Sequence, residues 1–380
     1  MSGFEIIHIN GESGLRGGER QLLYLACALR RKGHRNVLAA RAGSDISRQA
    51  RSLGFETWEL PFRGEWDLST ALTLRWRARG RGRTILHAHT GHGASMAAIA
   101  GAFGACPTVL HRRVDFPLSG SMSARWKYGS AGAVVAVSGA IKELLVAQGL
   151  AQEKVWVVPD GIPVDAEECS WVGTERGRFS PPSPAERTAF RDAISAEFNI
   201  PKRAAWVGNL AALVPHKDHD TLIAAAVIVL LKRPDTAFLI AGEGPEHGRL
   251  LEQIRRLGLL GRVFLLGRLP EPIPLLKSLD LFALSSWGEG MGSVLLEAAA
   301  CGVPIAATTA GGIPEVIEHE RSGLLASPRQ PEALAANIVR LAEDPGLARR
   351  LAAAARADLG RFSLSRMAEA VENIYGELVA

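Results

Sequence analysis

The sequence predicts an α/β protein with two domains, each built on a parallel β-sheet. Short apolar segments that fit buried strands alternate with helical segments along most of the chain, which is typical of parallel sheets covered by helices. The length of 380 residues corresponds to two domains at about 100–200 residues each. Hydrophobic residues make up 47% of the chain, which is enough for two large cores.

The first half of the chain fits one such domain. A first strand is expected at residues 4–10, and Gly17 and Gly18 open a helix that runs to Arg31. Paired glycines suit the turn from a first strand to a first helix, where the backbone must approach closely. Further strands are expected at residues 36–40, 57–60, 85–89, 134–138 and from 108 onward, and helices at 48–53 and 139–148.

The second half repeats the alternation. Strands are expected at residues 204–207, 237–241, 263–266, 281–284 and 305–308, and helices at 186–198, 293–301 and 365–379. Gly302 and Pro304 end the helix at 293–301. Residues 166–186 are polar and contain several prolines, so we expect a linker there.

A glycine-rich loop joins the strand at 281–284 to the helix at 293–301. Gly290 and Gly292 let the backbone approach a ligand with no side chain in the way. The helix start at Ser293 adds free amides and the positive end of the helix dipole, which attract an anion. The loop therefore predicts a phosphate-binding site.

Two carboxylates bracket this loop. Glu289 lies before the helix, and Glu297 lies about one turn inside it. A carboxylate does not bind phosphate, but it accepts hydrogen bonds from the hydroxyl groups of a sugar. The pair therefore favours a nucleotide-sugar site, and the alternative is that both are ordinary solvated charges of a loop and a helix.

This string resembles the E-x7-E motif of the retaining glycosyltransferases of family 4, which are group 1 glycosyl transferases with the GT-B fold. The resemblance implies two Rossmann-like domains, at residues 1–160 and 161–364, whose parallel sheets face each other across a cleft, and a C-terminal helix in 365–380 that crosses back to the first domain. It implies that Glu289 faces the donor sugar and that Glu297 holds the ribose. The implied donor-binding residues are Gly17, Gly18, Asn209, Lys217, Gly242, Arg268, Glu289, Gly290, Met291, Gly292, Ser293, Val294 and Glu297.

One departure from the family concerns the clamp that holds the donor diphosphate. The family has an arginine and a lysine there; Lys217 matches the lysine, but Ala212 stands at the arginine position. A leaving diphosphate gains negative charge, so the missing cation needs a replacement. The candidates are Arg16, Arg113 and Arg268.

His111 matches a family histidine that reaches the donor sugar and the acceptor side of the cleft, although a single histidine is also compatible with a structural role. Arg112 and Arg113 follow it and, with Arg16, are candidates for binding an anionic acceptor. The implied catalytic residues are His111, Lys217 and Glu289.

We expect no metal and no resident cofactor, because the nucleoside diphosphate sugar is a co-substrate. His87 and His89 share one face at a strand end, but no third ligand lies nearby in the sequence. The D-x-D triplet that begins at Asp218 sits at a helix start, where capping explains it, and related enzymes work without a metal. The four cysteines lack disulfide or metal-ligand spacing, which predicts a reduced, cytoplasmic environment.

Basic residues are concentrated in the first half. Residues 1–160 carry 21 Lys and Arg against 12 Asp and Glu, whereas the remainder carries 23 against 27. Five arginines fall within residues 75–83 around Trp76, a composition that fits nucleic acid, lipid headgroups or a solvated helix end. No nucleic-acid module surrounds them. No signal peptide or transmembrane helix is expected, so we expect contact with the cytoplasmic membrane face to be peripheral.

The expected function is metal-independent transfer of a sugar, with retention, from a nucleoside diphosphate sugar to a hydroxyl of a glycan or lipid-linked acceptor. The basic first half favours an anionic acceptor, such as lipopolysaccharide or another cell-surface glycan. The alternatives are a nucleotide-sugar 2-epimerase of GT-B fold and a non-catalytic nucleotide-sugar binding protein. The sugar, the base, the acceptor and the oligomeric state are not predicted.

Overall fold

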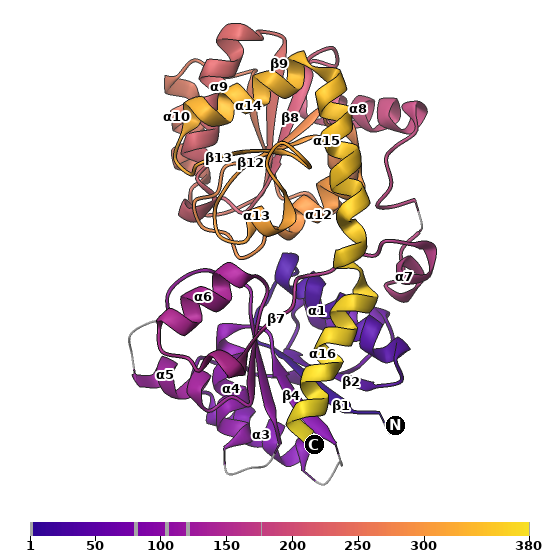
Figure 1. Cartoon of the computed structure of the whole chain (residues 1–380), viewed down its shortest axis with the longest axis vertical. Helices are drawn as coiled ribbons and strands as arrows, with labels where there is room; N and C mark the ends of the chain where they lie inside the picture. Colours follow the sequence, from indigo (N-terminus) through magenta and orange to yellow (C-terminus); the bar gives the residue numbers. More distant parts are fainter. Residues whose placement is uncertain (1–2, 80–82, 103–105, 119–121, 176, 380) are drawn as a thin grey trace. The chain divides into compact units, whose positions relative to one another are not determined.

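The computed structural model describes residues 3–79, 83–102, 106–118, 122–175 and 177–379. The chain forms two compact units (Figure 1). Unit 1 comprises Met1–Glu175 and Arg361–Ala380, and unit 2 comprises Arg176–Gly360. The chain therefore leaves unit 1 once and returns to it with its last helix.

Unit 1 contains a seven-stranded sheet in which every neighbouring pair of strands is parallel. The strands are β1 (Glu5–Asn10), β2 (Arg35–Arg41), β3 (Glu56–Leu60), β4 (Thr84–Ala88), β5 (Thr108–Arg112), β6 (Ala133–Ala136) and β7 (Val155–Val157). Their order is β3-β2-β1-β4-β5-β6-β7. The order reverses between β1 and β4, and ligands of such sheets bind at this switch point, beyond the carboxyl ends of the strands.

Helices lie between these strands and after the last of them. They are α1 (Gly17–Arg31), α2 (Asp45–Ser52), α3 (Leu68–Ala78), α4 (Gly91–Gly101), α5 (Met122–Gly129), α6 (Gly139–Ala147), α7 (Ala166–Trp171) and α16 (Leu364–Val379), with a 3-10 turn, η1 (Gln152–Lys154). One core cluster joins side chains of β1, β4, β5 and β6 to those of α1 and α16, including the fully buried Tyr375. The last helix is therefore part of the core of unit 1.

The expected linker at 166–186 is partly wrong, because α7 begins it and belongs to unit 1. The carboxylate of Glu168 explains this attachment. It accepts hydrogen bonds from the backbone N–H groups of Leu364, at 3.0 Å, and Ser365, at 2.8 Å. These bonds satisfy free amides at the start of α16. They also attach α7 to unit 1, so the first part of unit 1 extends beyond the expected boundary at residue 160.

Unit 2 contains a six-stranded parallel sheet. The strands are β8 (Ala205–Leu210), β9 (Thr236–Ala241), β10 (Val263–Gly267), β11 (Leu281–Leu284), β12 (Ile305–Thr308) and β13 (Leu324–Ala326). Their order, β10-β9-β8-β11-β12-β13, reverses between β8 and β11. The two loops that follow β8 and β11 therefore meet at the switch point of this sheet.

Unit 2 is covered by helices on both sides of its sheet. They are α8 (Pro184–Phe198), α9 (His219–Lys232), α10 (His247–Arg256), α11 (Ile273–Ser278), α12 (Ser293–Ala300), α13 (Ile313–Val316), α14 (Pro331–Glu343) and α15 (Pro345–Ala357), with a 3-10 turn η2 (Pro215–Lys217). A further 3-10 turn, η3 (Asp358–Phe362), spans the boundary from unit 2 back to unit 1. The prediction of parallel α/β sheets is confirmed for both units. Within the described residues, no helix is both long enough and apolar enough to cross a bilayer.

Candidate functional site

The loops after β8 and β11 are tied together at the switch point of unit 2. The Ser285 hydroxyl donates to the carbonyl of Lys217 at 3.0 Å, and the backbone N–H of Trp287 donates to the carbonyl of His216 at 2.9 Å. From the neighbouring strand β12, the Thr308 hydroxyl donates to the carbonyl of Ser286 at 2.6 Å. The glycine-rich loop is thereby fixed beside the loop that carries the predicted clamp lysine.

Two predicted catalytic residues, Lys217 and Glu289, form an ion pair in which Nζ lies 2.5 Å from Oε2. The Ser286 hydroxyl donates to the same carboxylate oxygen at 3.1 Å. The two side chains are only 18% and 11% exposed, so their charges are partly withdrawn from water. A cation and the carboxylate that is predicted to bind the donor sugar therefore lie side by side beyond the end of β11.

Glycines shape the backbone around Glu289. Gly292, the residue before α12, has a φ of +78°, which side chains rarely adopt. A Cβ on Gly311 would lie 1.8 Å from the carbonyl oxygen of Glu289, so only glycine fits there. The backbone N–H of Gly312 donates to that same oxygen at 3.2 Å. Gly311 and Gly312 thus hold the backbone of Glu289 in place.

The remaining loop residues lie where the sequence predicts them. Met291 is buried, and Ser293 and Val294 begin α12. Glu297 is partly buried on α12, four residues after Ser293. Because α12 starts at the carboxyl end of a parallel strand, its free amides face the region where a phosphate is expected.

Asn209, on β8, is hydrogen-bonded to β11 and to α9 beside this site. Its Nδ2 donates to the carbonyl of Ala283 on β11 at 2.9 Å, and its Oδ1 lies 3.2 Å from Nε2 of His219. Burial, assisted by the positive charge of Lys217, lowers the pKa of His219 to about 4. His219 is therefore neutral near pH 7 and donates to Asn209. The sequence offered no signal for this partner.

Asp218 has a structural role. Its carboxylate accepts a hydrogen bond from the backbone N–H of Thr221 at 3.3 Å and so caps α9. The third residue of the triplet, Asp220, pairs with Arg249 at 2.8 Å. The prediction of a helix cap is confirmed for Asp218, whereas the ion pair with Arg249 explains Asp220.

Arg268 is the clamp candidate that unit 2 itself supplies. The backbone N–H of Gly242 donates to the carbonyl of Gly267 at 2.8 Å, which joins the ends of β9 and β10. A Cβ on Gly242 would lie 3.5 Å from the backbone nitrogen of Ala212. Arg268 follows Gly267, is about half exposed, and lies 3.8 Å from Glu243. Arg268 therefore lies at the same cluster of strand ends as Ala212, which stands at the position of the family's clamp arginine.

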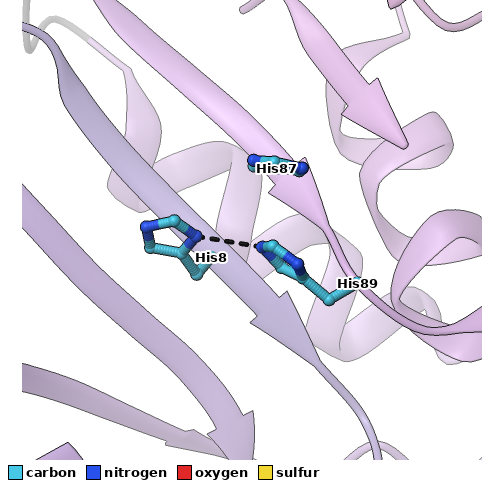
Figure 2. A group of neighbouring side chains, drawn as sticks. All are labelled: His8, His87 and His89. Atoms are coloured by element: carbon cyan, nitrogen blue, oxygen red, sulfur yellow. Dashed lines mark hydrogen bonds between the residues drawn. The ribbon is translucent and has the colours of Figure 1, made fainter. Parts of the chain in front are cut away.

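In unit 1, the switch point between β1 and β4 gathers histidines. His8 on β1 is the register partner of His87 on β4, and His89 follows the end of β4 (Figure 2). Neighbouring parallel strands in register present side chains on one face, so three imidazoles converge. His8 Nδ1 lies 3.0 Å from His89 Nε2, and the three available ring nitrogens lie within 4.8 Å of one another. The third histidine comes from β1, which is distant in the sequence, so the residues near His87 and His89 gave no sign of it.

Arg113 fixes the protons of this cluster. Its guanidinium, which only donates hydrogen bonds, lies 3.3 Å from His89 Nδ1. The proton of His89 must then reside on Nε2, which donates to His8 Nδ1. The proton of His8 in turn resides on Nε2, which lies 2.9 Å from Oδ1 of Asn36. One arginine thus orients a chain of three hydrogen bonds.

This series of hydrogen bonds shows whether the three histidines fit a metal ion. A metal ligand needs a free lone pair, yet the Arg113 hydrogen bond leaves His89 with a proton on the nitrogen that faces His8. Burial lowers the pKa values of His8, to about 4, and of His87 and His89, and the positive charge of Arg113 adds to this. A cation would also lie close to Arg113. The donor set therefore fits a neutral hydrogen-bonded network better than a metal centre.

His111 is held by the same arginine. Arg113 lies 3.4 Å from His111 Nδ1, so the proton of His111 resides on Nε2. Within the part of the chain that the structure describes, Nε2 of His111 and Nε2 of His87 are buried without a hydrogen-bond partner. Buried polar atoms normally have partners, so the Nε2–H of His111 can still donate to an acceptor, and its predicted contact with the donor sugar stays a prediction.

Asp160 anchors Arg113. Its carboxylate lies 3.0 Å from Nε of Arg113, and the side chains of Asp160 and Arg113 are only 7% and 10% exposed. Burial raises the pKa of Asp160, and the charge of Arg113 opposes this rise. Nothing in the local sequence indicates this ion pair, because its partners lie 47 residues apart. A Cβ on Gly18 would lie 3.7 Å from Cδ of Arg113, which places the predicted Gly17-Gly18 turn beside the pair.

The other predicted arginines differ in their surroundings. Arg16 precedes α1, and its backbone N–H donates to Glu19 at 2.9 Å. Arg112 donates to the carbonyl of Val114 at 3.0 Å and to the Tyr128 hydroxyl at 3.1 Å. Arg112 therefore shapes the loop that follows β5, and its predicted contact with an acceptor stays a prediction.

The arginine run at 75–83 is largely structural where it is described. Arg75 donates to the carbonyl of Ala100 near the end of α4, at 3.2 Å. Arg77 covers the ring of Trp58 at 5.0 Å, and Arg83 covers that of Phe4 at 4.4 Å. Arg81 lies outside the described residues. These contacts favour the helix-end interpretation over a nucleic-acid patch.

Two family profiles match the chain. The one described as "Glycosyltransferase Family 4" matches residues 15–166, and the one described as "Glycosyl transferases group 1" matches residues 190–358. Together they span most of the chain.

Among curated proteins, the chain is similar to D-inositol 3-phosphate glycosyltransferase of Salinispora tropica, with 32% identity over 55% of this chain and 45% of that protein. It is also similar to the GDP-mannose-dependent monoacylated alpha-(1-6)-phosphatidylinositol monomannoside mannosyltransferase of Corynebacterium glutamicum, with 34% identity over 53% of this chain and 54% of that protein. The matched stretch spans about half the length of these relatives.

Solved structures share the whole architecture. Anabaena Alr3699/HepE in complex with UDP-glucose has a TM-score of 0.83 at 23% identity, over 98% of this chain and 99% of that one. A glycosyltransferase of Rickettsia africae has a TM-score of 0.83 at 20% identity, over 100% and 99% of the two chains. At this level of identity the likeness establishes the fold.

Proposed function

Because the chain belongs to the family 4, group 1 glycosyltransferases with the GT-B fold, we propose that it transfers a sugar from a nucleoside diphosphate sugar to an acceptor hydroxyl with retained anomeric configuration. The observation that carries this proposal is the Lys217–Glu289 pair at the switch point of unit 2. A cation for the diphosphate and a carboxylate for the sugar stand together beside a helix N-terminus.

In the proposed reaction, the bond between the anomeric carbon and the diphosphate oxygen breaks, and the acceptor oxygen bonds to that carbon on the same face. The departing phosphate oxygen takes the proton of the acceptor hydroxyl. Lys217 and the amides at the start of α12 stabilise the charge that develops on the diphosphate. Glu289 accepts hydrogen bonds from the sugar, and Glu297 accepts them from the ribose.

Arg268 supplies the second clamp cation in this proposal. Ala212 leaves room at the arginine position of the family, and the backbone contacts between Gly242 and Gly267 bring the strand that precedes Arg268 to the same edge. The guanidinium is about half exposed and lies 3.8 Å from Glu243, and a diphosphate can compete with that carboxylate for it.

The proposed acceptor is a glycan or a lipid-linked molecule that carries negative charge, such as a lipopolysaccharide precursor or another cell-surface glycan. The basic residues of unit 1 support an anionic acceptor. The names of two relatives include phosphorylated acceptors, an inositol 3-phosphate and a phosphatidylinositol mannoside. Structural neighbours are described with UDP or UDP-glucose, which supports a nucleotide-sugar donor.

The test is incubation of the purified chain with UDP-glucose, UDP-N-acetylglucosamine or GDP-mannose, with and without lipid-linked and free phosphorylated acceptors. A transferase forms nucleoside diphosphate and a glycosylated acceptor together. Conversion of the donor sugar without any acceptor would identify the 2-epimerase alternative. Tight donor binding without turnover under every condition would identify the non-catalytic binding protein.

A further inference from the structure

Helix α3 of unit 1 exposes an apolar face. Its inner side packs on α4 and buries Ala71 and Leu74. Its outer side carries Leu68, Leu72 and Trp76, which are 59%, 60% and 73% exposed. Residues four apart lie on one face of a helix, so these three form a stripe. A surface helix normally places polar residues on this side, and α3 does not.

Two further tryptophans extend the stripe. Trp66 precedes α3, Trp126 lies on α5, and their rings stack with centroids 6.4 Å apart. They are 53% and 43% exposed. Scattered apolar residues on a surface need no explanation, but a contiguous set contributed by two helices marks an interaction site. We call Trp66, Leu68, Leu72, Trp76 and Trp126 the α3 surface.

The charges around the α3 surface are positive. Exposed arginines flank it at three points: Arg63 before Trp66, Arg79 at the end of α3, and Arg125 beside Trp126. The nearby carboxylates are already engaged. Glu65 pairs with Lys127 at 2.8 Å, and Asp67 caps α3 by accepting from the backbone N–H of Thr70 at 3.2 Å.

We propose that the α3 surface docks unit 1 on an anionic lipid bilayer, with α3 lying along the membrane plane. Tryptophan rings favour the headgroup level of a bilayer, and the leucines between them enter the acyl boundary. Arginines at the rim pair with anionic headgroups. Binding of a nucleic acid would use the arginines, but it would not explain why the leucines are exposed.

The proposal deepens the proposed function and rests on it, because it assumes that the acceptor is linked to a lipid. A chain that binds the bilayer meets an acceptor confined to that surface at a high local concentration. Vesicle binding itself requires neither a donor nor turnover. It is therefore measured separately from transfer activity. A failure to bind vesicles can then be distinguished from a failure to transfer sugar.

The experiment measures binding of the full chain, without a nucleotide sugar, to vesicles of phosphatidylcholine containing about one third phosphatidylglycerol. Sedimentation gives the bound fraction, and a blue shift of tryptophan emission reports burial of the rings. We expect binding to these vesicles at low salt, weaker binding at high salt, and little binding to pure phosphatidylcholine.

Variants identify the surface. Leu72→Ser/Trp76→Ser should weaken binding at least about tenfold. Arg79→Gln and Arg125→Gln should each weaken it about fivefold. The matched control Leu231→Ser changes an apolar residue of unit 2 that is 83% exposed and should leave binding unchanged.

Three results would overturn the proposal. The first is no binding of the native chain to anionic vesicles at low salt. The second is an equal loss of binding in the Leu231 control, which would mean that any exposed apolar residue suffices. The third is self-association in solution that the Trp76 substitution abolishes while vesicle binding stays unchanged, which would make the α3 surface a protein interface.

Discussion

Replacing Lys217 with methionine tests the proposed diphosphate clamp most directly. The change keeps much of the length of the side chain and removes a charge whose Nζ lies 2.5 Å from Glu289. A charge-assisted hydrogen bond to a phosphate contributes about 1.5–3 kcal/mol, so its loss should raise the Kd for a nucleoside diphosphate about 10- to 150-fold. The larger values apply here, because Glu289 is left unpaired and repels the phosphate.

Titration calorimetry with UDP and with GDP measures this effect, and UMP and GMP serve as comparison ligands. The monophosphates lack the outer phosphate, so their affinity should change less. The double variant Lys217→Met/Glu289→Gln removes the unpaired carboxylate and should recover part of the lost affinity. A transfer assay should show a fall in kcat as well, because the clamp acts on charge that develops during bond cleavage.

The control is Lys202→Met, which removes an exposed lysine of unit 2 that pairs with Asp192 at 2.8 Å. It loses one positive charge but no predicted ligand contact, and its Kd should match that of the native chain. The reasoning is refuted if Lys217→Met binds UDP and GDP as the native chain does. It is also refuted if the double variant binds no better than the single one.

Further predictions concern other residues. Glu297→Ala should lower affinity for the donor about tenfold, and Glu297→Gln less, in a thermal-shift titration. His219 is neutral when folded, with a pKa of about 4, and charged at low pH when unfolded, so the unfolded state binds more protons. The contribution of His219 to the free energy of unfolding should be complete above about pH 7.5 and fall by roughly 1.3 kcal/mol between about pH 7.5 and 5.5, which urea unfolding of native and His219→Gln chains measures. Dialysis against EDTA should leave activity unchanged. Arg113→Gln should let the proton of His111 move to Nδ1, as seen by nitrogen-15 NMR.

Each of these predictions has an outcome that contradicts it. Unchanged donor affinity in Glu297→Ala would remove the ribose assignment. An unfolding curve of His219→Gln that keeps the native pH dependence would show that this histidine titrates normally. Activity that disappears with EDTA and returns with zinc would contradict the neutral network at His8 and His89. A single His111 tautomer in both chains would mean that Arg113 does not set it.

Much of the fold could be predicted from local sequence patterns. Apolar runs of four to six residues matched strands such as β11 (Leu281–Leu284) because a strand buried on both faces has no polar positions. The start of α12 at Ser293 was predicted because Gly292 and the following apolar run are both local signals. The short helix α7 was missed because its attachment comes from Glu168, whose partners lie almost two hundred residues later in the chain.

The sequence by itself determined which residues form the candidate site of unit 2: the glycines, the lysine and the two carboxylates fall within two short segments, and strand-loop-helix geometry follows from neighbours along the chain. Tertiary structure decided which residues are partners. Only the parallel register of β1 and β4 sets His8 beside His87 and His89, and only the fold brings Asp160 to Arg113. The physical reason is that hydrogen bonds and ion pairs act over a few Å in space, whatever the distance along the chain.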